Sequence, residues 1–137
     1  MSKAIESYKD TIGAQRVRLF GYSGGGAIAS LVASRRSDVV HLVTIAAPLD
    51  HVVWTRHHKI TALSGSLNPK DFADQLFTLP QTHFIGEDDT IVPSSIALSF
   101  LRNFPDGAPA KILQIPNYGH KCCWEENWER RLRDINL

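Results

Sequence analysis

The sequence lacks any apolar run long enough to cross a membrane, and it lacks an excess of charge of either sign. Its longest apolar stretches, residues 39–43 and 45–49, are far shorter than the roughly 20 residues of a transmembrane helix. The formal net charge is +1, so the charge balance favours neither a nucleic acid nor a membrane surface as a partner. The first residues have no apolar core or cleavage pattern of a signal peptide, so a cytoplasmic location is the default expectation.

Cysteine is equally scarce, because the only two cysteines, Cys122 and Cys123, are adjacent in the sequence. Neighbouring residues rarely reach good disulfide geometry, and no second pair is present to complete a metal site. We therefore expect a pair of free thiols beside a loop. Internal repeats, low-complexity tracts and linkers are also missing, so the 137 residues are expected to form a single domain.

Segments rich in β-branched residues alternate with helix-like segments along the chain. This alternation is typical of βαβ units and predicts an α/β fold with a parallel four-stranded sheet flanked by helices. The expected strands cover residues 16–20, 39–46, 81–85 and 111–115. The expected helices cover residues 2–12, 27–35, 70–76 and 94–103 (with Ser94 as N-cap), and a last one begins near Trp124.

Residues 48–70 form the least regular part of the sequence. The stretch is long for a loop in a compact domain, so it is interpreted as a lid-like insertion. Its Trp54, Leu63 and Leu67 could line a substrate pocket or pack the lid down. Its three histidines (His51, His57 and His58) have no metal-ligand spacing and are expected to be solvated loop residues.

A Gly-x-Ser-x-Gly motif from Gly21 to Gly25 lies between an expected strand and an expected helix. This context is typical of a nucleophile elbow, which would expose the Ser23 hydroxyl and aim the Gly24 amide at a developing oxyanion. Two alternatives remain. The turn could serve packing alone, or Gly24-x-Gly26-x-x-Ala29 could bind a dinucleotide. The second needs an acidic residue closing the next strand, and Asp50 fits poorly because it lies beyond Pro48.

Candidates for the acid and the base follow the last two expected strands. Asp88 and Asp89 lie in the loop after residues 81–85, and either could serve as the acid or merely form the turn. His120 follows the last strand and could accept a proton from Ser23. His41 and His83 lie within or beside strands and are expected to be core or surface residues. In a parallel sheet the strand ends share one edge, so these distant residues can converge.

The order Ser23, Asp89, His120, the elbow and the sequence Gly86-Glu87-Asp88-Asp89-Thr90-Ile91-Val92-Pro93 resemble those of the α/β-hydrolases. Residues 48–51, 64–69 and 122–124 are similar to a group of bacterial α/β-hydrolases that lack an assigned substrate. The resemblance implies a three-layer α/β/α fold, Asp89 as the acid, Asp88 as a turn residue and His120 as the base.

The resemblance covers the later half of that fold, which usually has eight strands. We therefore interpret residues 1–137 as one shortened α/β-hydrolase domain. The first half would supply the second oxyanion donor. The strand at residues 16–20 would be an exposed edge, open to a missing N-terminal half or to a second copy of the chain.

The leading functional hypothesis is a serine hydrolase with the triad Ser23, Asp89 and His120. A carboxylic ester is the default substrate, a thioester or amide is an alternative, and an acyl-enzyme is the expected intermediate. Tyr22 and Trp54 are the residues expected to contact substrate, and no cofactor or metal is implied. A second hypothesis is a catalytically impaired fragment acting as a binding or interaction domain, and a third is nucleotide binding at the glycine turn.

Overall fold

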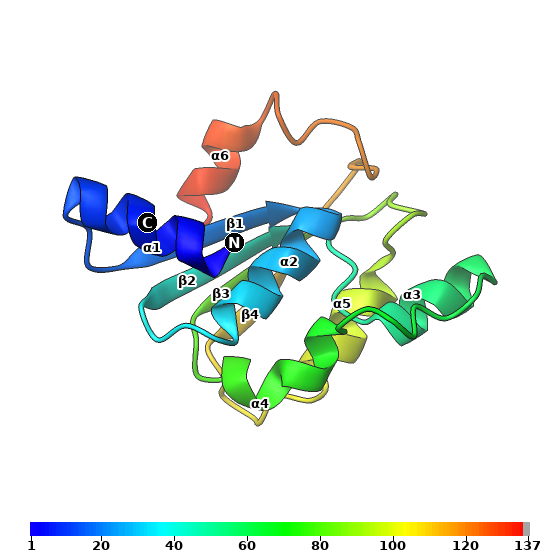
Figure 1. Cartoon of the computed structure of the whole chain (residues 1–137). Coiled ribbons are helices and arrows are strands. Elements are labelled where there is room, and N and C mark those ends of the chain that lie inside the picture. Colours follow the sequence, from blue (N-terminus) through cyan, green and yellow to red (C-terminus); the bar gives the residue numbers. More distant parts are fainter. Residues whose placement is uncertain (136–137) are drawn as a thin grey trace.

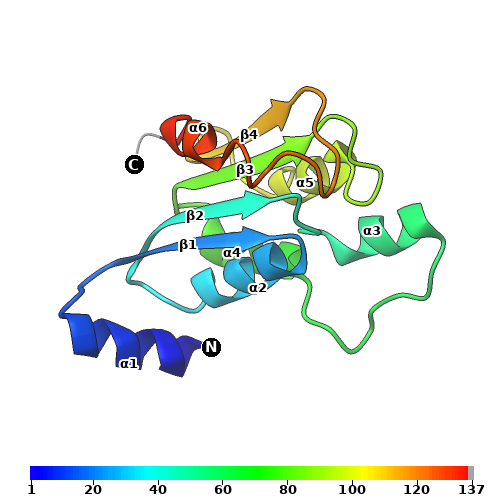
Figure 2. The same ribbon diagram turned by 90° about the horizontal axis from the view of Figure 1, so that it is seen from above.

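The computed structural model describes residues 1–135 and contains one four-stranded parallel sheet (Figures 1 and 2). Its strands are β1 (Val17–Tyr22), β2 (Val39–Ile45), β3 (Gln81–Gly86) and β4 (Ala110–Ile115), in the order β1-β2-β3-β4. All three ladders are parallel. The predicted fold class is confirmed, and the carboxyl ends of all four strands lie at one edge of the sheet.

Helices cover both faces of the sheet, which makes the fold three-layered (Figure 1). They are α1 (Ser2–Ile12), α2 (Gly24–Ala33), α3 (His51–His58), the 3₁₀ turn η1 (Pro69–Phe72), α4 (Ala73–Leu76), α5 (Ser94–Leu101) and α6 (Trp128–Arg133). The chain moves to the next strand in the same direction at each crossover. Right-handed crossovers therefore place α2, α4 and α5 on one face, while α6 covers the other. None of the helices in the described residues is long and apolar enough to span a membrane.

Two apolar clusters, one on each face of the sheet, hold the layers together. Leu42 of β2 and Phe100 of α5 belong to the first cluster, and Val43 of β2 and Trp124 belong to the second. Neighbouring residues of β2 thus point to opposite faces, as the period of two in a strand requires. Because both faces are covered, this central strand is almost entirely apolar.

Several predicted boundaries were wrong. β1 extends to Tyr22 and α2 begins at Gly24, so Ser23 alone forms the turn between them. Ser94 is not the N-cap of α5, because Pro93 takes that position. The last helix begins at Trp128 rather than near Trp124. Trp124 is nevertheless buried with that helix, so its predicted apolar character was right.

The structure also corrects two local predictions. Residues 48–70 are not uniformly irregular, because they contain the helix α3. Cys122 and Cys123 are joined as a disulfide, contrary to the expected free thiols, and Cys123 adopts a positive φ of 78° there. The expected helix at residues 2–12 is present as α1, but none of its residues is buried. Instead, ion pairs from Lys9 to Asp38 and from Glu6 to Arg36 hold α1 against the turn before β2.

Candidate active site

Ser23 occupies a strained backbone position between β1 and α2. Its φ is 50° and its ψ is −127°, which a residue with a side chain rarely adopts. The N–H of Ser23 donates to the carbonyl of Ile45 in β2 at 2.8 Å, so the neighbouring strand fixes the turn. At Gly26 a Cβ would lie 2.5 Å from the Cβ of Ala47, so the close approach of α2 to the sheet requires glycine.

The structure brings Ser23, His120 and Asp89 into one hydrogen-bonded chain. Ser23 Oγ lies 3.0 Å from Nε2 of His120, and Nδ1 of His120 lies 2.9 Å from Oδ2 of Asp89. The other carboxylate oxygen, Oδ1, accepts the backbone N–H groups of Ile91 and Val92 at 2.9 and 2.8 Å. Asp89 is 3% exposed, whereas Asp88 is exposed to solvent. The geometry therefore selects Asp89 over Asp88 as the partner of His120.

Backbone contacts fix the loops that carry the acid and the base relative to each other. The N–H of Asp88 donates to the carbonyl of Tyr118 at 3.0 Å. Gly86 lies so close to this carbonyl that an added Cβ would overlap it. The carbonyl of His120 accepts two donors, the Tyr22 hydroxyl at 2.8 Å and Nε1 of Trp124 at 3.1 Å. Tyr22 thus contacts the base loop, and it does not line the cavity that adjoins Ser23.

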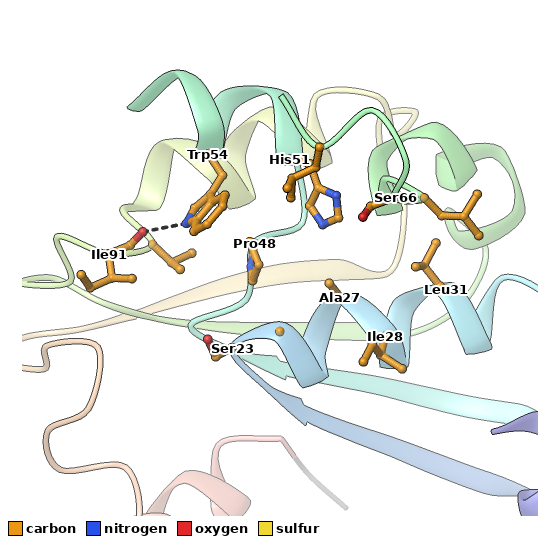
Figure 3. A pocket seen from close by; sticks show the side chains of 13 residues that line it. Ser23, Ala27, Ile28, Leu31, Pro48, His51, Trp54, Ser66 and Ile91 are labelled. Atoms are coloured by element: carbon orange, nitrogen blue, oxygen red, sulfur yellow. Dashed lines mark hydrogen bonds between the residues drawn. The ribbon is translucent and has the colours of Figure 1, made fainter. Parts of the chain in front are cut away.

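A largely apolar cavity of about 530 Å³ opens beside Ser23 (Figure 3). Trp54 lines it, and so does Gly24, whose amide begins α2. Ile28 of α2 also lines the cavity and is 47% exposed. Leu63 and Leu67 complete much of the apolar wall. Residues 48–68, which we call the cap segment, supply one side of the cavity, and α2 supplies the other.

Side chains of α3 attach the cap segment to the loop that follows Asp89. Nε1 of Trp54 donates to the carbonyl of Ile91 at 3.0 Å. Nε2 of His58 lies 2.7 Å from the same carbonyl, and Nε2 of His57 lies 3.1 Å from that of Thr90. His57 and His58 were expected to be solvated loop residues. His57 is exposed and His58 is half-buried, but both lie on a helix and bridge two segments.

Asp50 anchors the start of the cap segment. Its Oδ1 accepts the N–H groups of Val52 and Val53 at the N-terminus of α3. Its Oδ2 accepts the Ser99 hydroxyl at 2.6 Å and forms an ion pair with Lys70 at 2.9 Å. Burial acts to raise the pKa of this carboxyl, but the hydrogen bonds from Ser99 and Lys70 outweigh it and lower the pKa. Asp50 is therefore a charged helix cap, and its position does not suit the dinucleotide interpretation.

The remaining histidines of the sheet do not join this site. His83 is fully buried, its Nδ1 lies 2.8 Å from the Thr44 hydroxyl, and burial lowers its pKa to about 3. His41 lies 3.1 Å from the Thr82 hydroxyl, far along β2 from the strand end. Within residues 1–135, no group of three or more potential metal ligands is clustered.

A model of one protein family matches residues 1–122 of the chain, the serine hydrolase family FSH1. The chain belongs to the FSH1 serine hydrolase family. No match was found among curated proteins.

Solved structures of α/β-hydrolases share its fold. An esterase from Pyrococcus furiosus is 15% identical, with a TM-score of 0.76 over 96% of this chain and 57% of its own. An α/β fold family hydrolase from Bacillus anthracis is 9% identical, with a TM-score of 0.74 over 98% and 71%. The esterase domain of a Rhodothermus marinus protein is 23% identical, with a TM-score of 0.63 over 83% and 55%. The chain thus spans 55% to 71% of the length of these structures.

One polar residue of the site was missed by the sequence analysis. His51 lies in the cavity wall, where it projects from α3 toward α2 (Figure 3). Its position depends on Asp50 capping α3, and the preceding Pro48 made that stretch look like a loop. The only signal in the sequence was Asp50, a residue type favoured at N-caps, because residues 51–58 are mostly histidine, valine and other residues of low helix propensity.

Proposed function

We propose that this protein hydrolyses carboxylic esters through an acyl-enzyme, with Ser23 as nucleophile, His120 as base and Asp89 as the acid that orients it. The observation that carries the proposal is the unbroken contact chain from Ser23 Oγ to a buried carboxylate, with the serine at a strained elbow. Membership of a serine hydrolase family supports the same reaction class.

In the proposed reaction, the Ser23 hydroxyl attacks the ester carbonyl while Nε2 of His120 takes its proton. His120 then returns the proton to the leaving alcohol, and water repeats the sequence on the acyl-enzyme. Asp89 accepts the Nδ1–H of His120 and so holds the tautomer that leaves Nε2 free to accept. The Gly24 amide at the start of α2 would donate to the oxyanion, assisted by the helix dipole.

The cavity beside Ser23 favours an ester with an apolar chain. Its walls present Trp54, Ile28 and Leu67, and neither lysine nor arginine lines it. Burial of apolar chain carbons against such walls contributes roughly 0.8 kcal/mol per CH₂ group. We therefore expect kcat/KM to rise from acetate to hexanoate esters. Thioesters and amides would use the same residues, and their turnover relative to esters is a matter for direct assay.

Covalent labelling with a fluorophosphonate probe, followed by intact mass, tests the proposal. We expect a single adduct on the wild-type protein and none on Ser23→Ala. Ser30→Ala is a matched control, because Ser30 is a buried serine of the same helix that bonds only to the carbonyl of Gly26. No adduct on folded wild-type protein would instead favour a non-catalytic binding domain with an unreactive triad.

The free edge of the sheet supports a second proposal, about partners. Among the described residues, β1 pairs with β2 on one side and with no strand on the other. We propose that this edge receives another strand, either from a further half of the domain or from a second copy. Light scattering will separate these cases, because a second copy doubles the mass of the purified chain. A monomer in which all β1 amides exchange slowly would contradict a free edge.

A further inference from the structure

The apolar cavity beside Ser23 has a polar end. His51 and Ser66 lie in its wall together with Leu63, and the same three residues line an adjoining cavity of about 240 Å³. That second cavity is more polar, because Thr55, Asn68 and Asp71 also line it. A chain entering from Ser23 therefore passes apolar walls first and reaches hydrogen-bonding groups afterwards (Figure 3).

The His51 ring has one nitrogen available to a ligand. Its Nδ1 is enclosed and has no hydrogen-bond partner in residues 1–135. Its Nε2 is not enclosed in this way, and none of the described residues bonds to it. The backbone of His51 is already fixed, because its N–H donates to Oδ1 of Asn68 at 3.0 Å. The hydrogen bond of the His51 backbone thus holds the residue in the cavity wall, and Nε2 is accessible to a ligand.

The charge state of this end selects the kind of group that it accepts. Burial lowers the pKa of His51, although the charges of Asp50 and Asp71 oppose the shift, so the ring is neutral at neutral pH. No lysine or arginine lines either cavity. A carboxylate would therefore meet no positive charge and would lie near Asp71. A neutral hydroxyl suits the site better, since it can both donate and accept, and so can pair with either ring tautomer and with Ser66.

We propose that this hydrolase prefers esters whose acyl chain carries a hydroxyl group remote from the scissile carbonyl, recognised by His51 and Ser66. The inference rests on the proposed ester hydrolysis at Ser23. His51 acts here as a specificity-determining residue. It has no part in the proton transfers, which belong to His120.

The test compares p-nitrophenyl esters with matched acyl chains. Butyrate, hexanoate, octanoate and decanoate esters are each paired with the analogue that bears a terminal hydroxyl, carboxylate or amine. For at least one chain length we expect kcat/KM for the hydroxy ester to exceed that of the plain ester by about three- to tenfold, the usual effect of one neutral hydrogen bond. Higher kcat/KM for the carboxylate or the amine, or for the plain ester at every length, would overturn the proposal.

Two variants locate the effect. His51→Leu removes the ring nitrogens but keeps the bulk, and Ser66→Ala removes the hydroxyl. Both should abolish most of the preference for the hydroxy ester, measured as the ratio of kcat/KM for the hydroxy and plain esters of the same chain length. Leu63→Ala is the matched control, because it alters the same two cavities without removing a hydrogen bond, and it should leave the ratio unchanged. A preference that survives both polar variants would contradict the assignment.

The two proposals fail in distinguishable ways. A short isopropyl fluorophosphonate carries no hydroxyl for His51 or Ser66 to recognise, so labelling of the wild-type protein tests Ser23 as nucleophile separately from the proposed recognition. Normal labelling without any hydroxyl preference would overturn only the recognition by His51 and Ser66. Monoacetates of diols, compared with plain alkyl acetates, form the second substrate series. If a hydroxyl group raised kcat/KM only in the diol monoacetates, the recognised hydroxyl would belong to the leaving alcohol. That result would refute the acyl-chain assignment.

Discussion

The strand ends and the cap segment are held in different ways. At the strand ends, Ser23, Asp89 and His120 lie on turns fixed by backbone hydrogen bonds to neighbouring strands, over residues such as Leu42 that are fully buried. Within α3 only Thr55 is buried, and side chains attach the cap segment: Asp50 at its buried start, and Trp54 and His58 at the surface.

This difference assigns different tasks to the two regions. Groups that transfer protons need positions accurate to a fraction of an ångström, and backbone-fixed strand ends provide that. A pocket wall carried by an exposed segment can change its side chains at little cost to the sheet. We therefore expect changes at the strand ends to lower kcat for every substrate, and changes in the cap segment to alter the choice among substrates.

The largest expected effect is that of Asp89→Asn. The amide keeps an oxygen for the N–H groups of Ile91 and Val92, but its NH₂ group cannot accept the Nδ1–H of His120. We expect kcat for short and long esters alike to fall by roughly 10³ to 10⁴. Asp88→Asn, at the exposed neighbouring carboxylate, is the control and should remain near wild type. Equal activity of the two variants would remove Asp89 from the triad.

A smaller loss is expected when the acid and base loops are pushed apart. The Cβ of Gly86→Ala would overlap the carbonyl of Tyr118, and backbone at this site has little room to shift. A displacement of about 1 Å can cost about 10² in rate, so kcat should fall by that order. Gly119→Ala is the matched control, because its Cβ would lie 3.9 Å from the carbonyl of Asp88. Similar kcat values for both variants would show that this contact does not position the triad.

The smallest effect on chemistry should come from Asp50→Asn in the cap segment. The variant keeps a capping oxygen for α3 but loses the charge that pairs with Lys70. We expect the free energy of unfolding to fall by about 1 to 3 kcal/mol, and KM for long-chain esters to rise while phosphonate labelling persists. Asp74→Asn, exposed on α4, is the control for stability by urea denaturation. If kcat for acetate esters fell as much as kcat for long-chain esters, the cap segment would affect the chemical step as well as the choice of substrate. That result would contradict the difference between the two regions.

The sequence analysis predicted the strand ends better than the cap segment, for a physical reason. Around Ser23, Asp89 and His120 the local signals agree, because glycines, apolar strands and turn residues all follow from close packing at the sheet edge. In the cap segment the structure depends on contacts between distant residues. The contacts of Asp50 with Ser99 and of His58 with Ile91 leave no periodic pattern in the sequence, so α3 and the position of His51 in the cavity wall were missed.

The start of α6 is a second boundary that tertiary contacts decide and that local sequence patterns do not show. Trp124, Trp128 and Leu132 follow one another at a spacing of four residues, and all three belong to the same apolar cluster in the structure. The spacing could not show that Trp124 reaches this cluster from a turn, where its Nε1 donates to the carbonyls of Gly119 and His120. Periodicity reports which side chains are buried, and tertiary hydrogen bonds decide where the helix begins.

The most direct test of the account is to trap the acyl-enzyme. The protein is mixed with p-nitrophenyl hexanoate, quenched in acid within the first turnover, digested and mapped by mass spectrometry. We predict a hexanoyl group on the peptide that contains Ser23, formed at the rate of the p-nitrophenol burst, and neither adduct nor burst in Ser23→Ala. Ester hydrolysis by Ser23→Ala at the wild-type rate, or an acyl group on another residue, would contradict the account.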